Sequence, residues 1–417
     1  MSRKDQRKAP VLRFKGFTDD WELRKLGEVS DIVRGSSPRP ISDSKWFDTN
    51  SKVGWLRISD VTSQQGRIKK LDQHLSKLGE EKTRVLLSPH LLLSIAASVG
   101  YPVINYVPTG VHDGFLIFKN PKFQLNYGFY WLQNNKNKWQ KYGQPGSQVN
   151  LNSSIVENAK IFLPNNNEQS KIIALLLRID KMLALQQRKL DQLKQLKKAY
   201  LSDLFSIKNK PQIRFKGFKG KWKKSKLLDN VSNIIDFRGK TPKKLGMDWS
   251  DQGILALSAL NVKDGFIDKS IHAHYGDIKL YNKWMAGNKL HKGQVLFTTE
   301  APMGNVAQVP DNDKYILSQR TIAFNVNKDK ISDSFLAMLL QTTTVHNQLL
   351  SLSSGGTAKG VSQKSLSGLS VAIPLSLEEQ RKMEMTFKYI NHLIHFQQDK
   401  IRYLEENKQF LLQNMFI

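Results

Sequence analysis

Apolar residues recur every three to four positions along residues 168–205, a stretch without glycine or proline. This spacing predicts one helix of about 38 residues, roughly 57 Å long. The apolar positions fall on positions a and d of a heptad repeat, which is the pattern of a coiled coil. Position a is occupied by Leu176, Leu183, Leu190, Lys197 and Leu204, and position d by Ile172, Ile179, Gln186, Leu193 and Tyr200. Such a seam needs a partner helix, and a rod of this length can act as a spacer.

A second helix with the same pattern is predicted at the end of the chain, in residues 379–416, shifted by 211 positions. Its a positions are Phe387, Ile394, Ile401, Lys408 and Met415, and its d positions are Met383, Ile390, Gln397, Leu404 and Leu411. Two polar exceptions recur in register, Gln186 with Gln397 and Lys197 with Lys408. Because polar residues in a seam cost stability but fix register and partner choice, we interpret these four as register residues. We therefore predict that the two helices pair as a coiled coil.

The segment before each helix also occurs twice. The hexapeptide LRFKGF opens the first copy at residues 12–17, and IRFKGF opens the second at residues 213–218. Each hexapeptide is followed by a tryptophan, Trp21 or Trp222. Because aromatic residues repeated beside phenylalanine are more often core than base-stacking platforms, we expect both tryptophans to be buried.

Within each copy the predicted elements follow the same order. Short apolar segments bounded by turns predict the strands of a mixed or antiparallel sheet. The matched segments are residues 26–35 with 227–239, 56–68 with 255–267 without gaps, 91–100 with 295–304, and 112–118 with 318–324. Each copy then has a predicted helix, residues 125–142 or 334–352, and a glycine-rich polar loop, residues 143–152 or 353–362.

The predicted fold class is α/β, of the α+β type, with two tandem globular domains that are each followed by a long helix. An internal duplication on this scale predicts a pseudo-twofold molecule with two similar heads. The predicted order is a disordered basic N-terminus (residues 1–10), a first globular domain (11–165), a first long helix (166–206), a linker (207–212), a second globular domain (213–375) and a second long helix (376–417).

The chain carries a formal net charge of +28 and has a pI near 9.9, with basic residues in both halves. This excess favours a polyanionic partner, and nucleic acid rather than a membrane. Cysteine is absent, which excludes disulfides and zinc sites of the thiolate type. No apolar run of about eighteen residues occurs, and residues 1–10 lack the apolar segment of a signal peptide. We therefore expect a cytoplasmic protein with no membrane association.

The sequence contains no recognisable catalytic motif. It lacks a P-loop, a glycine-rich nucleotide fingerprint, a His-Glu-x-x-His metal motif and the Asn/Asp-Pro-Pro-aromatic tetrapeptide of amino-methyltransferases. His272 and His274 lack a third metal ligand and are interpreted as surface residues. Acidic residues near loops are not repeated, since the matched pairs are Glu300 with Ala96 and Asp113 with Gln319. We therefore predict that this chain has no cofactor or metal of its own and no catalytic activity alone.

The order of these motifs closely resembles that of specificity subunits of type I restriction-modification systems. The resemblance rests on the RFxGF opening with its tryptophan, an Arg-Gly-x-x-Pro loop, the glycine-rich loop that leads to Ile-x-x-Pro or Ile-Pro, and the Glu-Gln start of each long helix. The whole series occurs twice, and the resemblance covers nearly the entire chain.

This resemblance implies that each globular half is a target recognition domain that reads one part of a bipartite double-stranded DNA sequence. It also implies that the two long helices pack antiparallel as spacers and dock two modification subunits. Those subunits would carry S-adenosylmethionine and methylate adenine, and two restriction (motor-nuclease) subunits would use ATP and Mg²⁺. This chain would then be the non-catalytic subunit that recognises the DNA sequence and holds the other subunits together.

The two copies differ mainly in their loops, where base contacts are expected. Arg and Lys suit guanine edges, Asn and Gln suit adenine, and Ser or Thr suit a base or a phosphate. The predicted DNA-binding residues are Arg34, Ser36, Arg39, Ser147, Gln148 and Asn150 in the first domain, and Arg238, Lys240, Lys243, Arg320, Thr357 and Lys359 in the second. For each of them, a solvated loop residue without DNA contact is the alternative interpretation.

Two other classes of protein are alternatives to a specificity subunit. One is a stand-alone sequence-specific DNA-binding or chromatin-organising protein without enzymatic partners, and the other is a coiled-coil adaptor that binds only proteins. The net charge and the divergent polar loops disfavour the adaptor. Co-purification with two copies of a subunit that carries the methyltransferase tetrapeptide would distinguish the first two classes.

Overall fold

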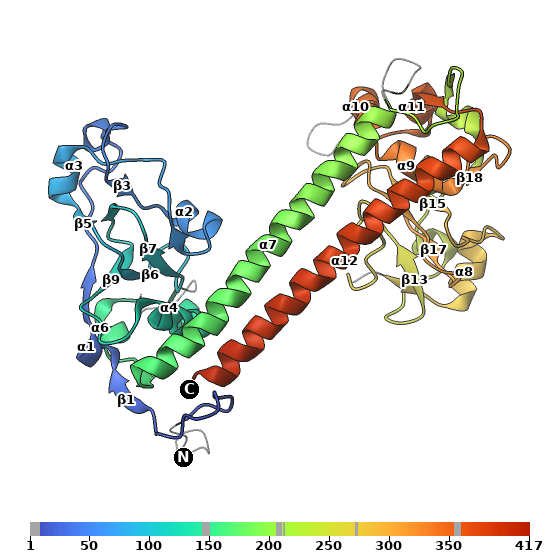
Figure 1. Ribbon diagram of the computed structural model, residues 1–417. Helices are drawn as coiled ribbons and strands as arrows, with labels where there is room; N and C mark the ends of the chain where they lie inside the picture. Colours follow the sequence, from blue (N-terminus) through green and yellow to red (C-terminus); the bar gives the residue numbers. More distant parts are fainter. Residues whose placement is uncertain (1–8, 144–150, 206–210, 212, 272–273, 354–359) are drawn as a thin grey trace. The chain divides into compact units, whose positions relative to one another are not determined.

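The computed structural model of the chain describes residues 9–143, 151–205, 211, 213–271, 274–353 and 360–417 (Figure 1). The chain forms two compact units. The first comprises residues 1–186 and 400–417, and the second comprises residues 187–399. Each unit contains one globular head and parts of both long helices, so the helices belong to both units.

The two long helices are α7 (Asn166–Leu204) and α12 (Leu377–Met415), each of 39 residues. Every predicted a and d position is buried or half-buried, while most positions between them are exposed, which confirms the seam. Both helices begin two residues before the start of the heptad pattern at 168 and 379, because side chains cap them. The Oδ1 of Asn165 accepts from the backbone N–H of Glu168 at 2.9 Å, and the Oγ of Ser376 accepts from that of Glu379 at 3.3 Å.

Within each unit α7 and α12 run antiparallel. In the first unit Asp180 of α7 pairs with Lys408 of α12 at 2.7 Å, and the start of α7 shares a core with the end of α12. In the second unit the hydroxyl of Tyr200, near the end of α7, donates to the backbone oxygen of Met383, near the start of α12, at 3.0 Å. The expected antiparallel pairing is therefore present in each unit.

The head of the first unit is built on one five-stranded and one three-stranded sheet. The larger sheet has the order β2 (Asp31–Arg34), β9 (Phe115–Lys119), β6 (Leu91–Ser94), β7 (Pro102–Asn105) and β4 (Arg67–Ile68), and the smaller has β3 (Gly54–Trp55), β8 (Thr109–Val111) and β5 (Arg84–Leu86). A separate pair joins β1 (Glu22–Lys25) to β10 (Lys160–Leu163). The helices of this head are α1 (Leu26–Val29), α2 (Ile58–Ser63), α3 (Lys77–Lys82), α4 (Leu125–Asn134), α5 (Lys136–Gln140) and α6 (Ser153–Glu157), with short 3-10 turns η2 (Ser44–Trp46) and η3 (Lys141–Gly143).

The head of the second unit repeats this plan with fewer strands. Its larger sheet has the order β12 (Val231–Asp236), β18 (Thr321–Val326), β15 (Val295–Thr298) and β16 (Val306–Gln308), and its smaller sheet has β14 (Tyr275–Gly276), β13 (Ile254–Leu257) and β17 (Ile316–Leu317). The separate pair is β11 (Lys223–Lys226) with β19 (Ser370–Ile373). Its helices are α8 (Ile278–Met285), α9 (Asp333–Leu340), α10 (Thr343–Leu352) and α11 (Gln363–Gly368), with 3-10 turns η4 (Leu227–Asn230) and η5 (Pro242–Leu245).

Three details differ from the sequence-based expectations. The helix predicted over residues 125–142 is interrupted at Asn135, whose Nδ2 donates to the backbone oxygen of Trp131 at 2.9 Å and ends α4. The helix predicted over residues 334–352 is interrupted at Thr342, whose Oγ1 accepts from the N–H of Val345 and starts α10. Polar side chains that bond nearby backbone compete with a continuous helix in this way. Residues 58–63, which lie within the segment 56–68 that was expected to form strands and turns, are helix α2.

The repeated hexapeptide is fastened to the start of each long helix by a buried carboxylate. In the first unit Glu168 accepts from Arg13 at 2.7 and 2.9 Å and from Trp21 Nε1 at 3.1 Å. The hydrogen bond to Glu168 raises the pKa of Arg13 despite its desolvation. Trp21 is 3% exposed, which confirms its predicted place in the core.

We call this set of hydrogen bonds from an arginine and a tryptophan to a buried glutamate the clamp, and the second unit has the same one. Arg214 donates to Glu379 at 2.7 and 2.8 Å, and Trp222 Nε1 donates to the same carboxylate at 3.4 Å. Trp222 is also buried, as predicted. The adjacent glutamines are used in a similar way, since the Nε2 of Gln169 donates to Pro164 and that of Gln380 donates to Pro374. The repeated RFxGF, Trp and Glu-Gln signatures are therefore parts of one structural joint in each unit.

Candidate nucleic-acid interface

Each head contains one short pair of parallel strands in its smaller sheet, β3 with β8 in the first and β13 with β17 in the second. Parallel strands end at the same edge of a sheet, so the segments that follow them leave side by side. Backbone hydrogen bonds continue each pair, from Leu56 to Gly110 at 3.2 Å and from Ser318 to Leu257 at 3.0 Å. We call these segments the loop edge, which comprises residues 34–39, 57–60 and 112–114 in the first head and 236–243, 258–261, 300, 318–320 and 360–361 in the second.

The register of these strands corrects the alignment of the two copies. Trp55 pairs with Gly110, and Ala256 pairs with Ile316, so Arg57 occupies the place of Ser258. The gapless match of residues 56–68 with 255–267 would instead have placed Arg57 opposite Ala256. The turns that follow also match in the corrected register, because each is closed by a side chain three residues after its start.

The Arg-Gly loop of the first head joins the loop edge through its backbone. Gly35 donates to the backbone oxygen of Phe115 at 2.9 Å, and Ser36 donates to that of Val111 at 3.0 Å. A Cβ on Gly35 would lie 2.1 Å from the backbone oxygen of His112, so this approach requires a glycine. The predicted contact residue Ser36 therefore lies beside the 112–114 turn.

Asp113 accepts hydrogen bonds from three polar side chains of this loop. Arg34 Nε donates to its backbone oxygen at 2.6 Å, Arg39 Nη2 donates to its Oδ2 at 2.6 Å, and Ser37 Oγ donates to its Oδ1 at 2.8 Å. Burial opposes ionisation of Asp113, but the hydrogen bond from Ser37 and the charges of Arg39 and Arg34 hold its pKa below the usual value. The structure thus brings together Arg34, Ser36 and Arg39, as the motif suggested, around a carboxylate that sequence reasoning had considered only as a catalytic candidate.

The predicted residues of the second head also meet at its loop edge. Arg238 is bound by the carboxylate of Asp236 at 2.9 Å and donates from Nη1 to the backbone oxygen of Val361 at 3.0 Å. Burial opposes ionisation of Asp236, whereas its hydrogen bond with Arg238 keeps the pKa of Asp236 low. Val361 belongs to the described end of the glycine-rich loop, and its backbone N–H donates to the backbone oxygen of Thr299 at 2.9 Å. This end of the loop therefore lies at the same edge as the Arg-Gly loop.

Three further predicted residues of the second head, Lys240, Lys243 and Arg320, lie within the described residues. The Nζ of Lys240 lies 4.7 Å from the ring centre of Phe237, and its backbone oxygen accepts from Gln319. Lys243 is exposed in η5. Arg320 has a φ of 65° and lies 3.7 Å from Glu300. Ser147, Gln148, Asn150, Thr357 and Lys359 lie outside the described residues. DNA contact by any of these residues stays a prediction.

The four register residues all lie on the inner side of the helix pair. Lys408 pairs with Asp180, while Lys197 donates to Gln341 at 2.9 Å and lies 5.0 Å from the ring centre of Phe387. Burial lowers the pKa of Lys197. Gln186 is half-buried and Gln397 is 2% exposed. Their role in setting the register stays a prediction, and the two lysines make different contacts.

The part of the chain that the structure describes contains no group of three or more histidine, aspartate or glutamate side chains placed to hold a metal ion. His274 stacks on Trp249 with ring centres 5.4 Å apart, and His272 lies outside the described residues. Across the same described residues, no helix has the length and apolar character needed to cross a membrane.

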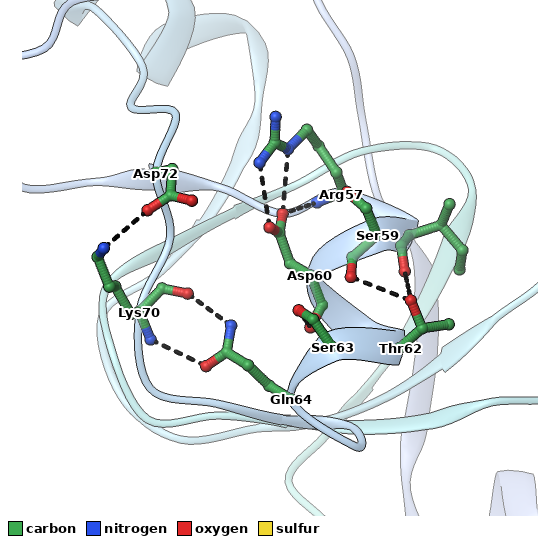
Figure 2. A network of polar contacts seen from close by, with 9 residues as sticks. Arg57, Ser59, Asp60, Thr62, Ser63, Gln64, Lys70 and Asp72 are labelled. Carbon is green, nitrogen blue, oxygen red and sulfur yellow. Dashed lines mark hydrogen bonds and ion pairs between the residues drawn. The ribbon is translucent and has the colours of Figure 1, made fainter. Parts of the chain in front are cut away.

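Sequence reasoning missed two features of the loop edge. One is Asp113 as the partner of Arg34 and Arg39. The other is a polar network around α2, in which Arg57 is bound by Asp60 and Lys70 pairs with Asp72 (Figure 2). Arg57 and Asp60 are three positions apart in a segment that was expected to form a strand and a turn. The gapless alignment of the two copies was two residues out of register here, so it did not match them with Ser258 and Asn261. Their position after β3 becomes evident only from the strand register.

Known proteins match the chain over most of its length. A family model described as "Type I restriction modification DNA specificity domain" matches residues 18–195 and 219–406. Among relatives from Methanocaldococcus jannaschii, the putative type I restriction enzyme MjaX specificity subunit is 22% identical, with 94% of this chain and 92% of the relative aligned. The type I restriction enzyme MjaVIII specificity subunit is 24% identical over 94% of this chain and 91% of the relative.

Two solved structures share the fold. The S subunit of a type I restriction-modification system from M. genitalium has a TM-score of 0.60 at 13% identity and covers 98% of this chain and 99% of its own. A chain from a study of complex assembly and conformational transition of the type I R-M system has a TM-score of 0.57 at 17% identity, covering 94% and 96%. Two family matches in tandem, one over each predicted copy, confirm the duplicated fold. The chain therefore belongs to the type I restriction modification DNA specificity family, as a specificity subunit with two target recognition domains.

Proposed function

We propose that this chain reads a bipartite double-stranded DNA target, with one half-site for each head. The observation that carries the proposal is that the loop edge has the same backbone arrangement in both heads but different side chains. Asp113 and Arg57 of the first head are replaced by Gln319 and Ser258 in the second. A shared frame with different hydrogen-bonding groups suits two readers of different base sequences. The net charge of +28 suits the phosphate backbone.

The direct test is to map methylated DNA in the host before and after deletion of this chain. We expect one methylated motif with two defined half-sites and an undefined gap to disappear on deletion and to return when the chain is restored. A stand-alone DNA-binding protein, the alternative function, would leave the methylated motifs unchanged. A motif with one continuous half-site would contradict a bipartite reader.

The proposal also assigns the catalytic steps to partner subunits and DNA recognition to this chain. Two modification subunits would supply S-adenosylmethionine and methylate adenine, and two restriction subunits would supply ATP- and Mg²⁺-dependent translocation and cleavage. This chain would supply neither cofactor nor chemistry. Robust methyl transfer by the purified chain alone, without partners, would contradict this assignment.

An exposed aromatic stripe on α12 supports partner docking. Tyr389, Phe396, Tyr403 and Phe410 follow one another at intervals of seven residues and are 57–64% exposed. A straight helix drifts by only about 20° per heptad, so the four rings stay on one side of the helix. Large exposed apolar groups in a row are typical of protein-interaction surfaces. We propose that this stripe receives a modification subunit.

Replacing Phe396 and Tyr403 together with serine is expected to prevent co-purification of the modification subunit. Exposed aromatic anchors contribute about 2 kcal/mol or more each at an interface, so the pair should weaken binding by at least roughly a thousandfold. The thermal unfolding midpoint of the chain should change little because both rings are exposed. Leu87→Ser, at a residue that is 78% exposed in the first head, is the matched control. Undiminished co-purification of the double variant would exclude this stripe.

Alanine at Arg39 or Lys243 is expected to weaken DNA binding by the complex. If the side chain contacts a phosphate, each loss should reduce the slope of log affinity against log salt by about 0.9. If it contacts a base, one half-site should become less selective while the slope stays the same. Arg24→Ala, in an exposed pair with Glu22 on β1, is the control. Unchanged affinity and an unchanged methylated motif in both variants would show that these loops do not contact DNA.

A further inference from the structure

Arg57 is the first residue to leave the sheet after β3, at the loop edge of the first head. The strand β3 is parallel to β8, and the backbone N–H of Leu56 still bonds to Gly110 of that strand. The segment that follows β8 contains His112, whose ring lies 5.6 Å from that of Trp55, and Asp113, which holds Arg34 and Arg39. Arg57 therefore emerges among the residues already predicted to contact DNA.

The Arg57 side chain is held in one orientation by Asp60. Its Nε and Nη2 donate to the two carboxylate oxygens at 3.2 and 3.1 Å, and the backbone N–H of Arg57 donates to the same carboxylate at 2.9 Å. The Asp60 side chain is 9% exposed, whereas that of Arg57 is 42% exposed. Asp60 lies in the first turn of α2, so its own position is fixed by the helix. A buried, helix-borne carboxylate thus orients an arginine that reaches solvent.

The outer edge of the Arg57 guanidinium is available to a ligand. Among the described residues, the hydrogen bonds of this guanidinium go to Asp60 alone and use Nε and one proton of Nη2. Figure 2 shows the third nitrogen pointing away from Asp60 and from α2. Nη1 and the second proton of Nη2 form a two-donor fork. Such a fork matches the O6 and N7 acceptors of guanine in the major groove.

Asp60 favours a base over a phosphate as the partner of this fork. The carboxylate neutralises the guanidinium and would repel a phosphate brought to its other side. The O6 and N7 atoms of guanine carry no net charge, so the pair can donate to them without that repulsion. A fixed side chain also suits base recognition, where small displacements change which base fits, more than it suits a phosphate contact.

The second head has the same turn but a different side chain. Asn261 Oδ1 accepts from the backbone N–H of Ser258 at 3.1 Å, as Asp60 accepts from that of Arg57, and it also accepts from Ser258 Oγ at 2.8 Å. The frame is therefore preserved, while a long two-donor side chain is replaced by a short hydroxyl. This difference is expected at a position that determines sequence specificity.

We propose that Arg57, oriented by Asp60, reads a guanine in the half-site of the first head. This inference rests on the proposed function as a bipartite DNA reader. Asp60 is a positioning residue in this scheme, because it acts through Arg57.

The test compares the wild-type complex with modification subunits and complexes that carry Arg57→Gln or Arg57→Lys. The probes are duplexes with the methylated motif and duplexes in which each base pair of the first half-site is substituted in turn. We expect both variants to lose roughly 5- to 150-fold of the discrimination at one G·C pair. The second half-site should be read as before. The salt dependence should not change for Arg57→Lys, because this variant keeps the charge pair with Asp60. Lysine keeps the charge but cannot present the fork, so it should not restore discrimination.

Arg24→Gln is the control for loss of an exposed arginine in the same head. Thermal unfolding of each variant shows whether the head is intact, and Arg57→Lys preserves the charge pair if Arg57→Gln unfolds. Equal weakening on all duplexes with a flatter salt dependence would identify a phosphate contact and overturn the proposal. Unchanged discrimination at every G·C pair would overturn it as well. Failure of the wild-type complex to prefer any sequence would instead overturn the proposed function.

Discussion

Replacing Glu168 with alanine is expected to lower the free energy of unfolding of the first unit by about 3–5 kcal/mol, the typical cost of breaking a buried ion pair from one side. The Glu168 side chain is 1% exposed and receives three hydrogen bonds, two from Arg13 and one from the indole of Trp21. Its removal would leave the guanidinium of Arg13, which is 13% exposed, without its carboxylate. It would also leave the buried Trp21 N–H without a partner. Denaturant unfolding of the full chain would measure the loss.

Two variants sharpen this experiment. Glu379→Ala removes the equivalent carboxylate of the second unit, whose side chain is 2% exposed, and should destabilise that unit by a similar amount. Glu22→Ala removes an exposed pair with Arg24 and should cost at most about 1 kcal/mol. If Glu168→Ala lowered the free energy of unfolding as little as Glu22→Ala, the clamp would not be the interaction that joins the hexapeptide to the helix.

The long helices could be predicted from the sequence because their information is local. The heptad spacing of apolar residues in 168–205 and 379–416 fixes both the helix and its buried side, and the structure shifts each end by only one or two residues. The clamp could not be predicted in the same way. Arg13 and Glu168 are 155 residues apart, and a repeated Arg or Glu-Gln signature does not reveal which distant side chain it meets.

The candidate site was predictable as a set of loops but not as a set of contacts. The repeated Arg-Gly-x-x-Pro motif pointed to Arg34, Arg39 and Arg238, and the structure places all three at the loop edge. Their partners depend on strand order and register, because β9 brings Asp113 next to the first loop and β18 follows Gln319 in the second. Arg57 was overlooked for the same reason. Its importance follows from the parallel pairing of β3 with β8, which the alternation of apolar residues in two-residue strands does not specify.

The second large effect is expected at Asp180, which joins α7 to α12 in the first unit. Its carboxylate accepts from Tyr130 at 2.6 Å and pairs with Lys408 at 2.7 Å and with Arg67 at 3.5 Å. The side chains of Lys408 and Arg67 are only 15% and 17% exposed. Asp180→Ala would leave two half-buried cations close together without their anion. We expect a loss of about 2–4 kcal/mol in the free energy of unfolding of this unit, slightly below the cost at Glu168 because the site is less buried.

A double-mutant cycle with Lys408 separates the ion pair from the loss of packing. If Asp180 mainly balances Lys408, then Asp180→Ala in a Lys408→Met background should cost about 1–3 kcal/mol less than in the wild-type chain. Asn391→Ala is the matched control, since Asn391 is the neutral counterpart of Asp180 in the second copy of the long helix. That substitution should lower the free energy of unfolding by less than about 1 kcal/mol.

The coupling energy between Asp180 and Lys408 tests the register role of Lys408. A coupling below about 0.5 kcal/mol would mean that the charge of Lys408 does not determine how α12 aligns with α7. A strong coupling would support its predicted role in setting the register, because a shift of α12 by one heptad would separate the two charges by about 10 Å.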